Sequence, residues 1–144
     1  RGLSPDAGVT YFLPRLVGMQ TALEWCMTGR IFDAQEALDR GLVRSLHAPA
    51  ELMDTARAIA REIAHNTSAV SVAMTRAMLW RLSTEPHPMM AHRIDSRSIY
   101  RLSRSRDARE GVQSFLEKRP PAFPDRVSED MPDFYPWWDE PGYA

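Results

Sequence analysis

Hydrophobic residues recur at helical spacing along most of this sequence, and the spacing predicts a mostly helical chain. In residues 50–64, which follow Pro49, the apolar side chains fall on one face of a helix. The same pattern predicts a second helix from near Ser68 to just before residues 85–88, and a third helix over residues 89–105. This half of the chain therefore reads as a series of amphipathic helices.

Capping signals predict where two further helices begin. Asp33 and Glu36 have the spacing of a capping box, and Gly41 stands where a glycine commonly follows the last turn of a helix. Asp107 and Glu110 have the same spacing, and two consecutive prolines close the segment that follows them. We expect a short helix after the first pair and a longer one after the second.

The first residues of the chain also predict a helix start. In Ser4-Pro5-Asp6, serine is a favoured N-cap, proline suits the first helical position, and an acid suits the first turn. Pro14 then limits this helix to two or three turns. A second helix is expected over residues 19–27, between two glycines.

One short segment has the composition of a strand. Residues 42–46 are the only plausible strand in the sequence, and they are too few to find a partner within it. Because an isolated strand is not stable alone, we expect it to pair with polypeptide elsewhere.

Residues 120–144 differ from the rest of the chain. They contain six of the 11 prolines and six of the 13 aromatic residues. Prolines prevent a continuous helix, and the aromatic rings favour contact with a protein surface. We interpret the segment as an extended arm that packs on its own subunit or on a neighbour, with a disordered tail as the alternative. The sequence thus divides into residues 1–47, a helical region 48–119 and the arm.

Composition excludes several classes of protein. Apolar residues make up 44% and charged residues 26% of the 144, which is ordinary for a folded domain and not for a disordered chain. One cysteine cannot form an internal disulfide and indicates a reducing compartment such as the cytoplasm. A net charge of −1 gives no reason to expect binding to nucleic acid. The sequence also has no apolar run long enough to span a membrane. Residues 125–144 alone carry a net charge of −5.

Two features are candidates for chemistry. Asp6, in the predicted first turn of a helix, has the position of a general base or nucleophile held ionised by the helix dipole. The alternative is that it only accepts hydrogen bonds from first-turn amides. The second feature is a stripe of arginines on one face of the helix over residues 89–105, formed by Arg93, Arg97, Arg101 and Arg104. Such a stripe suits polyphosphate binding, and the alternative is a solvated helix face. No zinc-site spacing and no glycine-rich phosphate loop is present in the sequence.

Three blocks of sequence resemble the crotonase (enoyl-CoA hydratase/isomerase) superfamily. The first is GLSPDAGVTYFLPRLVG from Gly2, the second runs from Met27 to Val43, and the third is DAREGVQSFLEKR from Asp107. They stand in the family's order and cover about residues 1–124.

The resemblance implies that this chain is the C-terminal half of a crotonase-like subunit. Such subunits have a ββα spiral core, of which residues 1–47 would be the end, followed by a helical trimerisation region. The chain would then be a mostly α fragment of an α/β fold, and residues 42–46 would be an outlying piece of the spiral core. The resemblance also implies a homo-oligomer, trimer or hexamer, and an acyl-CoA substrate with no separate cofactor or metal. The oxyanion hole and the two glutamates of a hydratase would lie upstream of Arg1.

The resemblance suggests roles for six residues of this sequence. Asp6 falls where some members carry a catalytic aspartate, and the neighbouring residues would line the acyl pocket. Lys118 matches a position whose ammonium reaches the CoA phosphates, and Tyr100 or Ile99 stands near the adenine. The implied substrate-binding residues are Ala7, Gly8, Tyr11, Tyr100 and Lys118.

Three functions remain open from the sequence. The first is hydration of 2-enoyl-CoA thioesters through an enolate held in an oxyanion hole. The second is an enoyl- or dienoyl-CoA isomerase in which Asp6 shuttles the proton. The third is a non-catalytic oligomerisation module.

Overall fold

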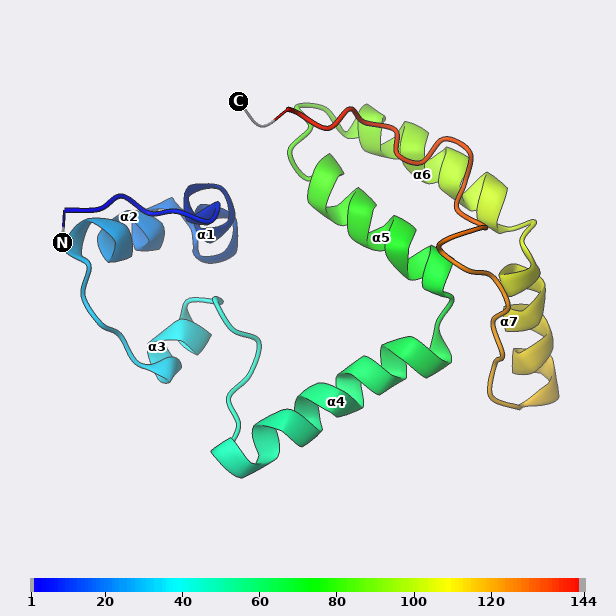
Figure 1. Cartoon of the computed structure of the whole chain (residues 1–144), viewed down its shortest axis with the longest axis horizontal. Coiled ribbons are helices and arrows are strands. Elements are labelled where there is room, and N and C mark those ends of the chain that lie inside the picture. The colour runs from blue at the N-terminus through cyan, green and yellow to red at the C-terminus, as the bar shows by residue number, and fades with distance from the viewer. Residues whose placement is uncertain (1, 143–144) are drawn as a thin grey trace. The chain divides into compact units, whose positions relative to one another are not determined.

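The structure is a computed structural model that describes residues 2–142. Within that range it contains seven helices and no strand (Figure 1). The chain forms two compact units, the first running to Ala56 and the second starting at Arg57, and each is described by itself. The prediction of a mostly α chain is confirmed.

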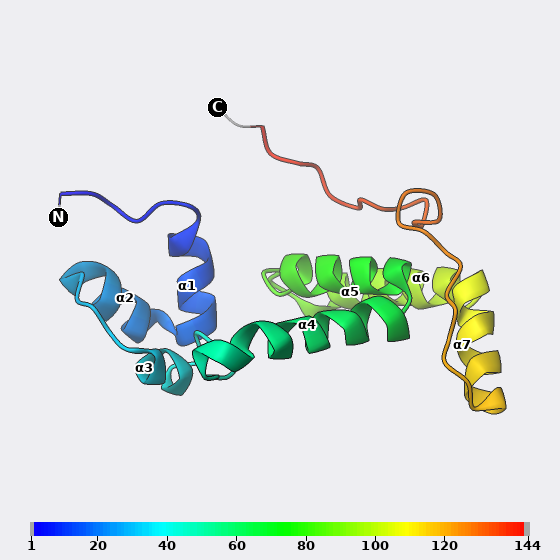
Figure 2. The ribbon, with the colours of Figure 1, turned by 60° about the horizontal axis from the view of Figure 1, so that its bottom comes forward.

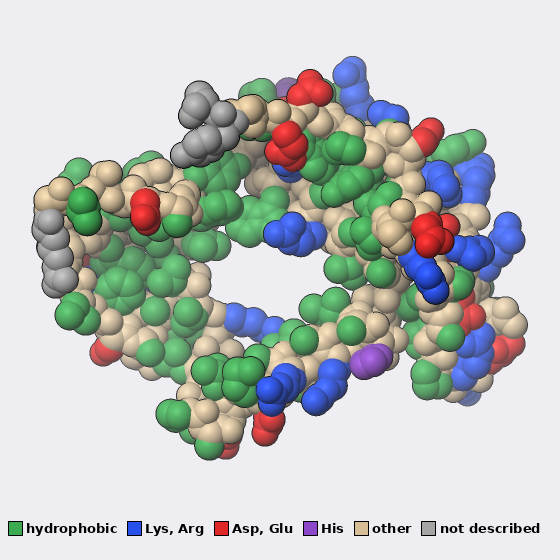
Figure 3. Space-filling model, in the orientation of Figure 1, with side chains coloured by type: hydrophobic (Ala, Val, Ile, Leu, Met, Phe, Trp, Pro, Cys, Tyr) green, Lys and Arg blue, Asp and Glu red, His purple; other side chains and the backbone are tan. Residues whose placement is uncertain are grey.

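The first unit holds three short helices: α1 (Val9–Val17), α2 (Met19–Thr28) and α3 (Ala34–Asp39). α1 and α2 pack against each other (Figure 2). The buried apolar side chains of the unit are Ala22 and Trp25 of α2 and Ala37 of α3. The Trp25 ring stacks on Phe32, with ring centroids 3.9 Å apart. This small core is bordered by many exposed apolar side chains, which gather on the face of the unit seen in Figure 3.

α3 begins and ends as its sequence predicts. The side chain of Asp33 accepts a hydrogen bond from the backbone N–H of Glu36 at 2.8 Å. At the other end, Gly41 has a φ of 79°, and its N–H donates to the carbonyl of Leu38. The N–H of Leu42 donates to Ala37 at 2.8 Å, which completes a Schellman motif. Glycine is required here because a left-handed residue without a Cβ carries no steric cost.

The predicted strand over residues 42–46 is not formed. Its first two residues, Leu42 and Val43, donate their N–H groups to the carbonyl of Ala37 at the end of α3. Residues 45 and 46 have no regular secondary structure. The physical reason is that a strand of this length needs a neighbouring strand, which we expected from polypeptide elsewhere.

α4 (Pro49–Asn66) connects the two units and has no buried residue. It is amphipathic, yet its apolar face is open: the exposed fractions are 50% for Leu52, 37% for Ile59 and 47% for Ile63. The two helices that follow are α5 (Ala69–Leu82) and α6 (Pro88–Leu102), and these lie side by side. The core of the second unit includes Val70 and Met74 of α5 and Ile94 of α6. As predicted, α5 begins near Ser68, and the Ser68 hydroxyl caps the helix by accepting from the N–H of Ser71.

α7 (Arg106–Glu117) differs from its prediction at its first turn. Its N-cap is Ser105, whose hydroxyl accepts from the N–H of Ala108 at 3.0 Å. Asp107 lies inside the helix, is buried, and accepts a hydrogen bond from the backbone N–H of Asp125 at 2.8 Å. Glu110 is not a capping residue either, because its carboxylate binds Arg119. Both acids predicted to form a capping box instead accept hydrogen bonds from residues that follow the helix.

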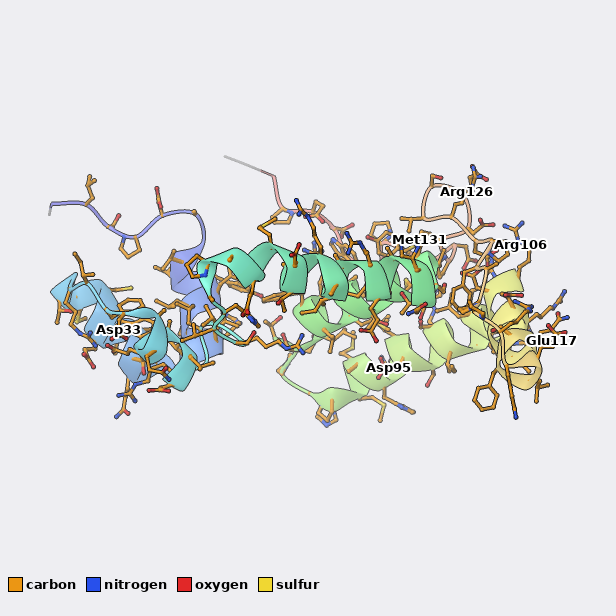
Figure 4. All side chains as sticks on the ribbon, turned by 90° about the horizontal axis from the view of Figure 1, so that it is seen from below. Asp33, Asp95, Arg106, Glu117, Arg126 and Met131 are labelled. Carbon is orange, nitrogen blue, oxygen red and sulfur yellow. The ribbon has the colours of Figure 1, made fainter. Side chains whose placement is uncertain are left out.

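The arm turns back from the end of α7 and lies against helices of its own chain. Glu110 accepts from the N–H of Ala122, and the Asp125 carboxylate accepts from Arg106 Nε at 2.7 Å and from the Asp107 N–H at 3.2 Å. Arg106 also reaches Asp130. Figure 4 shows Arg106 and the arm residues Arg126 and Met131 toward the same end of α7, away from Glu117.

Candidate functional site

The loop before α1 carries the predicted catalytic residue. Asp6 is exposed and lies ahead of the helix, because α1 begins at Val9 with Gly8 as its N-cap. The prediction that Ser4 caps a helix containing Asp6 is therefore wrong. The carbonyl of Asp6 accepts from the N–H of Val9 at 2.9 Å, so Asp6 starts a turn. Its carboxylate is presented from that turn and not from the positive end of a helix.

Backbone conformation explains why the helix starts late. Ala7 and Gly8 both have positive φ angles, 49° and 75°, in the left-handed region. Residues in this conformation cannot form part of a right-handed helix, so α1 begins only after them, at Val9. Glycine adopts this conformation freely, whereas alanine there is strained by about 1 kcal/mol. A strained residue beside an exposed acid is a feature typical of functional loops.

Tyr11, on the first turn of α1, is part of the same surface. Its ring is 42% exposed and meets Phe12 edge to face, with centroids 5.1 Å apart. The Arg15 guanidinium lies 3.7 Å from the Tyr11 ring centroid and donates to the Tyr11 carbonyl. The structure thus brings Asp6, Ala7, Gly8 and Tyr11 together within one turn and the start of one helix.

The remaining predicted site residues belong to the second unit. Lys118 is the C-cap of α7, is exposed, and has a left-handed φ of 54°. Its ammonium forms no ion pair with any residue from 2 to 142. The neighbouring Arg119, by contrast, is bound to Glu110 and Glu117. Lys118 therefore presents an uncommitted positive charge at the end of the helix.

Tyr100 and Ile99 lie on α6 and are both exposed, at 65% and 69%. The Tyr100 ring is covered on one face by Arg104, whose guanidinium lies 3.7 Å from the ring centroid. Ile99 lines a pocket of about 340 Å³ that is formed by α5, α6, α7 and the arm, together with Leu102 and Phe123.

Among residues 2–142, two arginines of the stripe lie over aromatic rings, and the other two do not. Arg97 lies over the Phe134 ring of the arm at 4.3 Å, and Arg104 lies over Tyr100. Arg93 and Arg101 are exposed. Two of the four guanidinium groups are thus used in cation–π contacts, which spacing alone does not reveal.

Phe115 is an exposed aromatic residue that the sequence analysis did not single out. It is 81% exposed on α7, and its carbonyl accepts from the N–H of Lys118 at 3.2 Å. Exposed rings are surfaces on which nucleotide bases stack. The signal available in the sequence was the hydrophobic pair Phe115 and Leu116 on a helix whose polar face is strongly charged.

A charged cluster in the first unit was also missed. The guanidinium of Arg30 binds the carboxylates of Glu24 and Glu36, and Glu36 accepts from Trp25 Nε1 at 3.0 Å. Hydrogen bonds from Arg30, then from Trp25, lower the pKa of Glu36 to about 2. In α7, hydrogen bonds from Arg119 and from the Ala122 N–H lower the pKa of Glu110 to about 2. Hydrogen bonds within the fold keep both carboxylates ionised, so their low pKa values do not identify them as catalytic acids or bases.

Searches for other kinds of site among residues 2–142 give two results. No cluster of three or more His, Cys, Asp or Glu side chains is placed to hold a metal ion. None of the helices in this range combines the length and apolar character needed to cross a membrane.

Comparison with known proteins identifies the family. The model of the enoyl-CoA hydratase/isomerase family matches residues 1–126. An enoyl-CoA hydratase of Alternaria alternata is 40% identical over 130 residues, which are 90% of this chain and 43% of the relative. A carnitinyl-CoA dehydratase of Salmonella paratyphi A is 33% identical over 129 residues, 87% of this chain and 49% of the relative. The crystal structure of a probable enoyl-CoA hydratase/isomerase from Mycobacterium abscessus superimposes with a TM-score of 0.82 at 33% identity, covering 87% of this chain and 49% of that one.

These matches define a mostly α fragment similar to part of solved enoyl-CoA hydratase structures. The chain belongs to the enoyl-CoA hydratase/isomerase family. It spans about half the length of the relatives that it matches.

Proposed function

We propose that this chain is the C-terminal half of an enzyme that hydrates 2-enoyl-CoA thioesters. The observation that carries the proposal is the family match over residues 1–126, supported by relatives named as an enoyl-CoA hydratase and a carnitinyl-CoA dehydratase. In this reaction water oxygen bonds to C3, C2 takes a proton, and the double-bond electrons pass through an enolate of the thioester. Upstream polypeptide supplies the oxyanion hole and the carboxylates that handle water and proton.

The second unit of this chain binds the nucleotide end of the substrate. Lys118 offers an exposed ammonium that has no ion-pair partner among the described residues, which suits a phosphate. Phe115 and Tyr100 offer exposed rings for the adenine. Arg93 and Arg101 add positive charge to the surface of α6.

The first unit forms part of the acyl site. Ala7 and Gly8 carry little or no side chain in a left-handed turn, so the backbone of this loop can approach the acyl group closely. Tyr11 adds an exposed ring on the next turn.

Kinetics of the full-length enzyme test the nucleotide site. Lys118→Asn removes the charge and keeps a residue that tolerates a left-handed conformation. Hydration of crotonyl-CoA is expected to show KM raised about tenfold with kcat nearly unchanged, because the contact is remote from the reacting atoms. Arg109→Ala, which removes an exposed charge from the same helix, is the matched control and leaves both constants unchanged. An unaltered KM for Lys118→Asn would exclude Lys118 from CoA binding.

Isomerisation with Asp6 as the proton shuttle is a second candidate. It is favoured by one observation, the exposed carboxylate of Asp6 beside the strained Ala7. The test compares Asp6→Asn with wild type on 2-enoyl and dienoyl thioesters, with Asp54→Asn, an exposed acid on α4, as control. Loss of isomerisation alone supports the shuttle, and undiminished rates in both reactions exclude it.

We also propose that the full-length protein assembles into a trimer or hexamer. The open apolar face of α4, with Leu52, Ile59 and Ile63 exposed, favours burial against other polypeptide. Sedimentation velocity of the full-length protein distinguishes the outcomes. A monomer contradicts the proposal, and an oligomer that neither binds CoA nor hydrates enoyl thioesters identifies a non-catalytic assembly module.

A further inference from the structure

The arm beyond Arg119 has two parts that contact the helices by different kinds of interaction. We call residues 120–132 the root and residues 134–140 the tip. The whole tip lies outside the family match, because that match ends at residue 126. What each part does can therefore be argued from its own contacts.

The root is held by buried groups in addition to the partly exposed ion pairs of Arg106 with Asp125 and Asp130. Asp107 and Asp125, exposed by only 4% and 7%, each accept a hydrogen bond from the backbone N–H of the other residue. The side chain of Phe123 lies against Gly111 of α7, where an added Cβ would meet the ring at 3.6 Å. Pro132, at the end of the root, is among the most completely buried side chains. Contacts of this kind exclude water and are weakly affected by salt.

The tip is held by two arginines on partly exposed surfaces. Arg97 of α6 lies over the Phe134 ring at 4.3 Å. Arg81 of α5 lies over the Trp138 ring at 3.8 Å and binds the Glu140 carboxylate at 2.7 Å. The side chain of Arg81 is 37% exposed and that of Glu140 is 70% exposed.

These tip contacts are individually weak. An exposed ion pair contributes about 0–1 kcal/mol and an exposed cation–π contact about 0.5–1 kcal/mol. Each also requires the ordering of long side chains, and salt screens the ionic part within about 10 Å. The geometry therefore sets a root with fully buried anchors beside a half-buried tip whose ionic contacts are partly exposed.

The tip also has contacts within the arm itself. The Tyr135, Trp137 and Trp138 rings contact one another edge to face, with centroids 4.8–6.2 Å apart. Trp138 Nε1 donates to Glu140 at 2.5 Å, and the Tyr135 N–H donates to Pro132. These contacts lie within the arm, so the tip can move as a unit about the root.

We propose that the arm is a strap with a fixed root and a releasable tip, and that Arg81 and Arg97 decide whether the tip lies on α5 and α6. Release frees Arg97 from the Phe134 ring, and frees Arg81 from the Trp138 ring and the Glu140 carboxylate. The strap thus controls whether these two guanidinium groups are engaged by the arm. This inference does not depend on the proposed enzymatic reaction.

Hydrogen–deuterium exchange of the full-length protein, read by mass spectrometry, tests the strap. Exchange at the amides of residues 134–140 is compared with exchange at residues 120–132, at about 0.05 M and about 1 M NaCl. We expect salt to speed exchange in the tip and leave the root unchanged. Arg81→Ala is expected to speed tip exchange about tenfold at low salt, from the summed ion-pair and cation–π losses.

Matched controls come from the same two helices. Arg76→Ala on α5 and Arg93→Ala on α6 remove exposed guanidinium groups that have no partner among residues 2–142, and they are expected to leave tip exchange unchanged. Arg97→Ala is expected to behave like Arg81→Ala with a smaller effect. The proposal is overturned if Arg81→Ala leaves tip exchange at the wild-type rate. It is equally overturned if root and tip open together, or if the wild-type tip exchanges like a free peptide at low salt.

Discussion

The reciprocal hydrogen bonds between Asp107 and Asp125 predict an unequal response to two matched substitutions. Asp125 uses both of its oxygens: Oδ1 accepts from Arg106 Nε at 2.7 Å and Oδ2 accepts from the Asp107 N–H at 3.2 Å. Asp107 uses one, because its Oδ2 is buried with no hydrogen-bond partner among the described residues. An asparagine can replace one accepting oxygen and not two.

The magnitude follows from the donor that each substitution leaves without an acceptor. In Asp125→Asn, either the Arg106 guanidinium or the Asp107 N–H faces the new amide NH₂. The side chain takes the orientation that keeps its oxygen on the buried Asp107 N–H, because a buried donor without a partner costs about 1–3 kcal/mol. The NH₂ group then faces Arg106, and the charge-assisted bond between Arg106 and the Asp125 carboxylate, which is only 5% exposed, is replaced by a contact between two donors. We therefore expect Asp125→Asn to cost about 2 kcal/mol and Asp107→Asn less than about 1 kcal/mol.

Urea unfolding of the full-length protein, followed by circular dichroism, measures the difference. Asp133→Asn, an exposed acid in the same arm, is the control and is expected to change the free energy of unfolding by less than about 0.5 kcal/mol. The reasoning is refuted if Asp107→Asn costs as much as Asp125→Asn, or if Asp125→Asn cannot be distinguished from the control.

Three further predictions concern pH, backbone conformation and one indole. The pKa values of Glu36 and Glu110 are lowered to about 2, so the stability they contribute is present above about pH 4.5 and is lost as the pH falls toward 2. The free energy of unfolding, measured across that range, should fall less steeply in Glu110→Gln, and an unchanged slope contradicts this. Gly8→Ala should lower the free energy of unfolding by about 1–2 kcal/mol, because φ is +75° and the new Cβ lies 3.1 Å from a phenyl carbon. Ala7→Gly, at a φ of 49°, should be nearly neutral in the same urea unfolding measurement. Trp25→Phe should cost about 1 kcal/mol through the lost indole hydrogen bond and Trp25→Ala about 3–5 kcal/mol, and a Trp25→Phe variant as stable as wild type would show that the bond contributes nothing.

Local signals predicted the helices well where the capping partner is close in sequence. α5 and α3 begin near Ser68 and Asp33 as expected, because each of these side chains accepts from an amide three residues later. Prediction failed where a residue at a helix start is engaged by distant chain. Asp107 has the composition of a cap, but it binds the backbone of Asp125, 18 residues away. Helix periodicity contains no information about that partner.

The candidate site was predicted in part. Motif resemblance located Asp6, Ala7 and Gly8, and the structure places them in one turn. The sequence did not indicate that Asp6 precedes the helix, because two left-handed residues in succession leave no signal in the hydrophobic pattern. The roles of these residues in catalysis stay predictions.

The paired indoles of the tip also give the arm an optical signature. Trp137 and Trp138 are 4.8 Å apart with ring planes at 85°, close enough for their excited states to couple. Such coupling produces bands of opposite sign in circular dichroism, so the fold of this short segment can be followed without attaching a label. The guanidinium of Arg81 over one of the two rings makes that ring differ from its neighbour, and emission from Trp138 should shift when the cation departs.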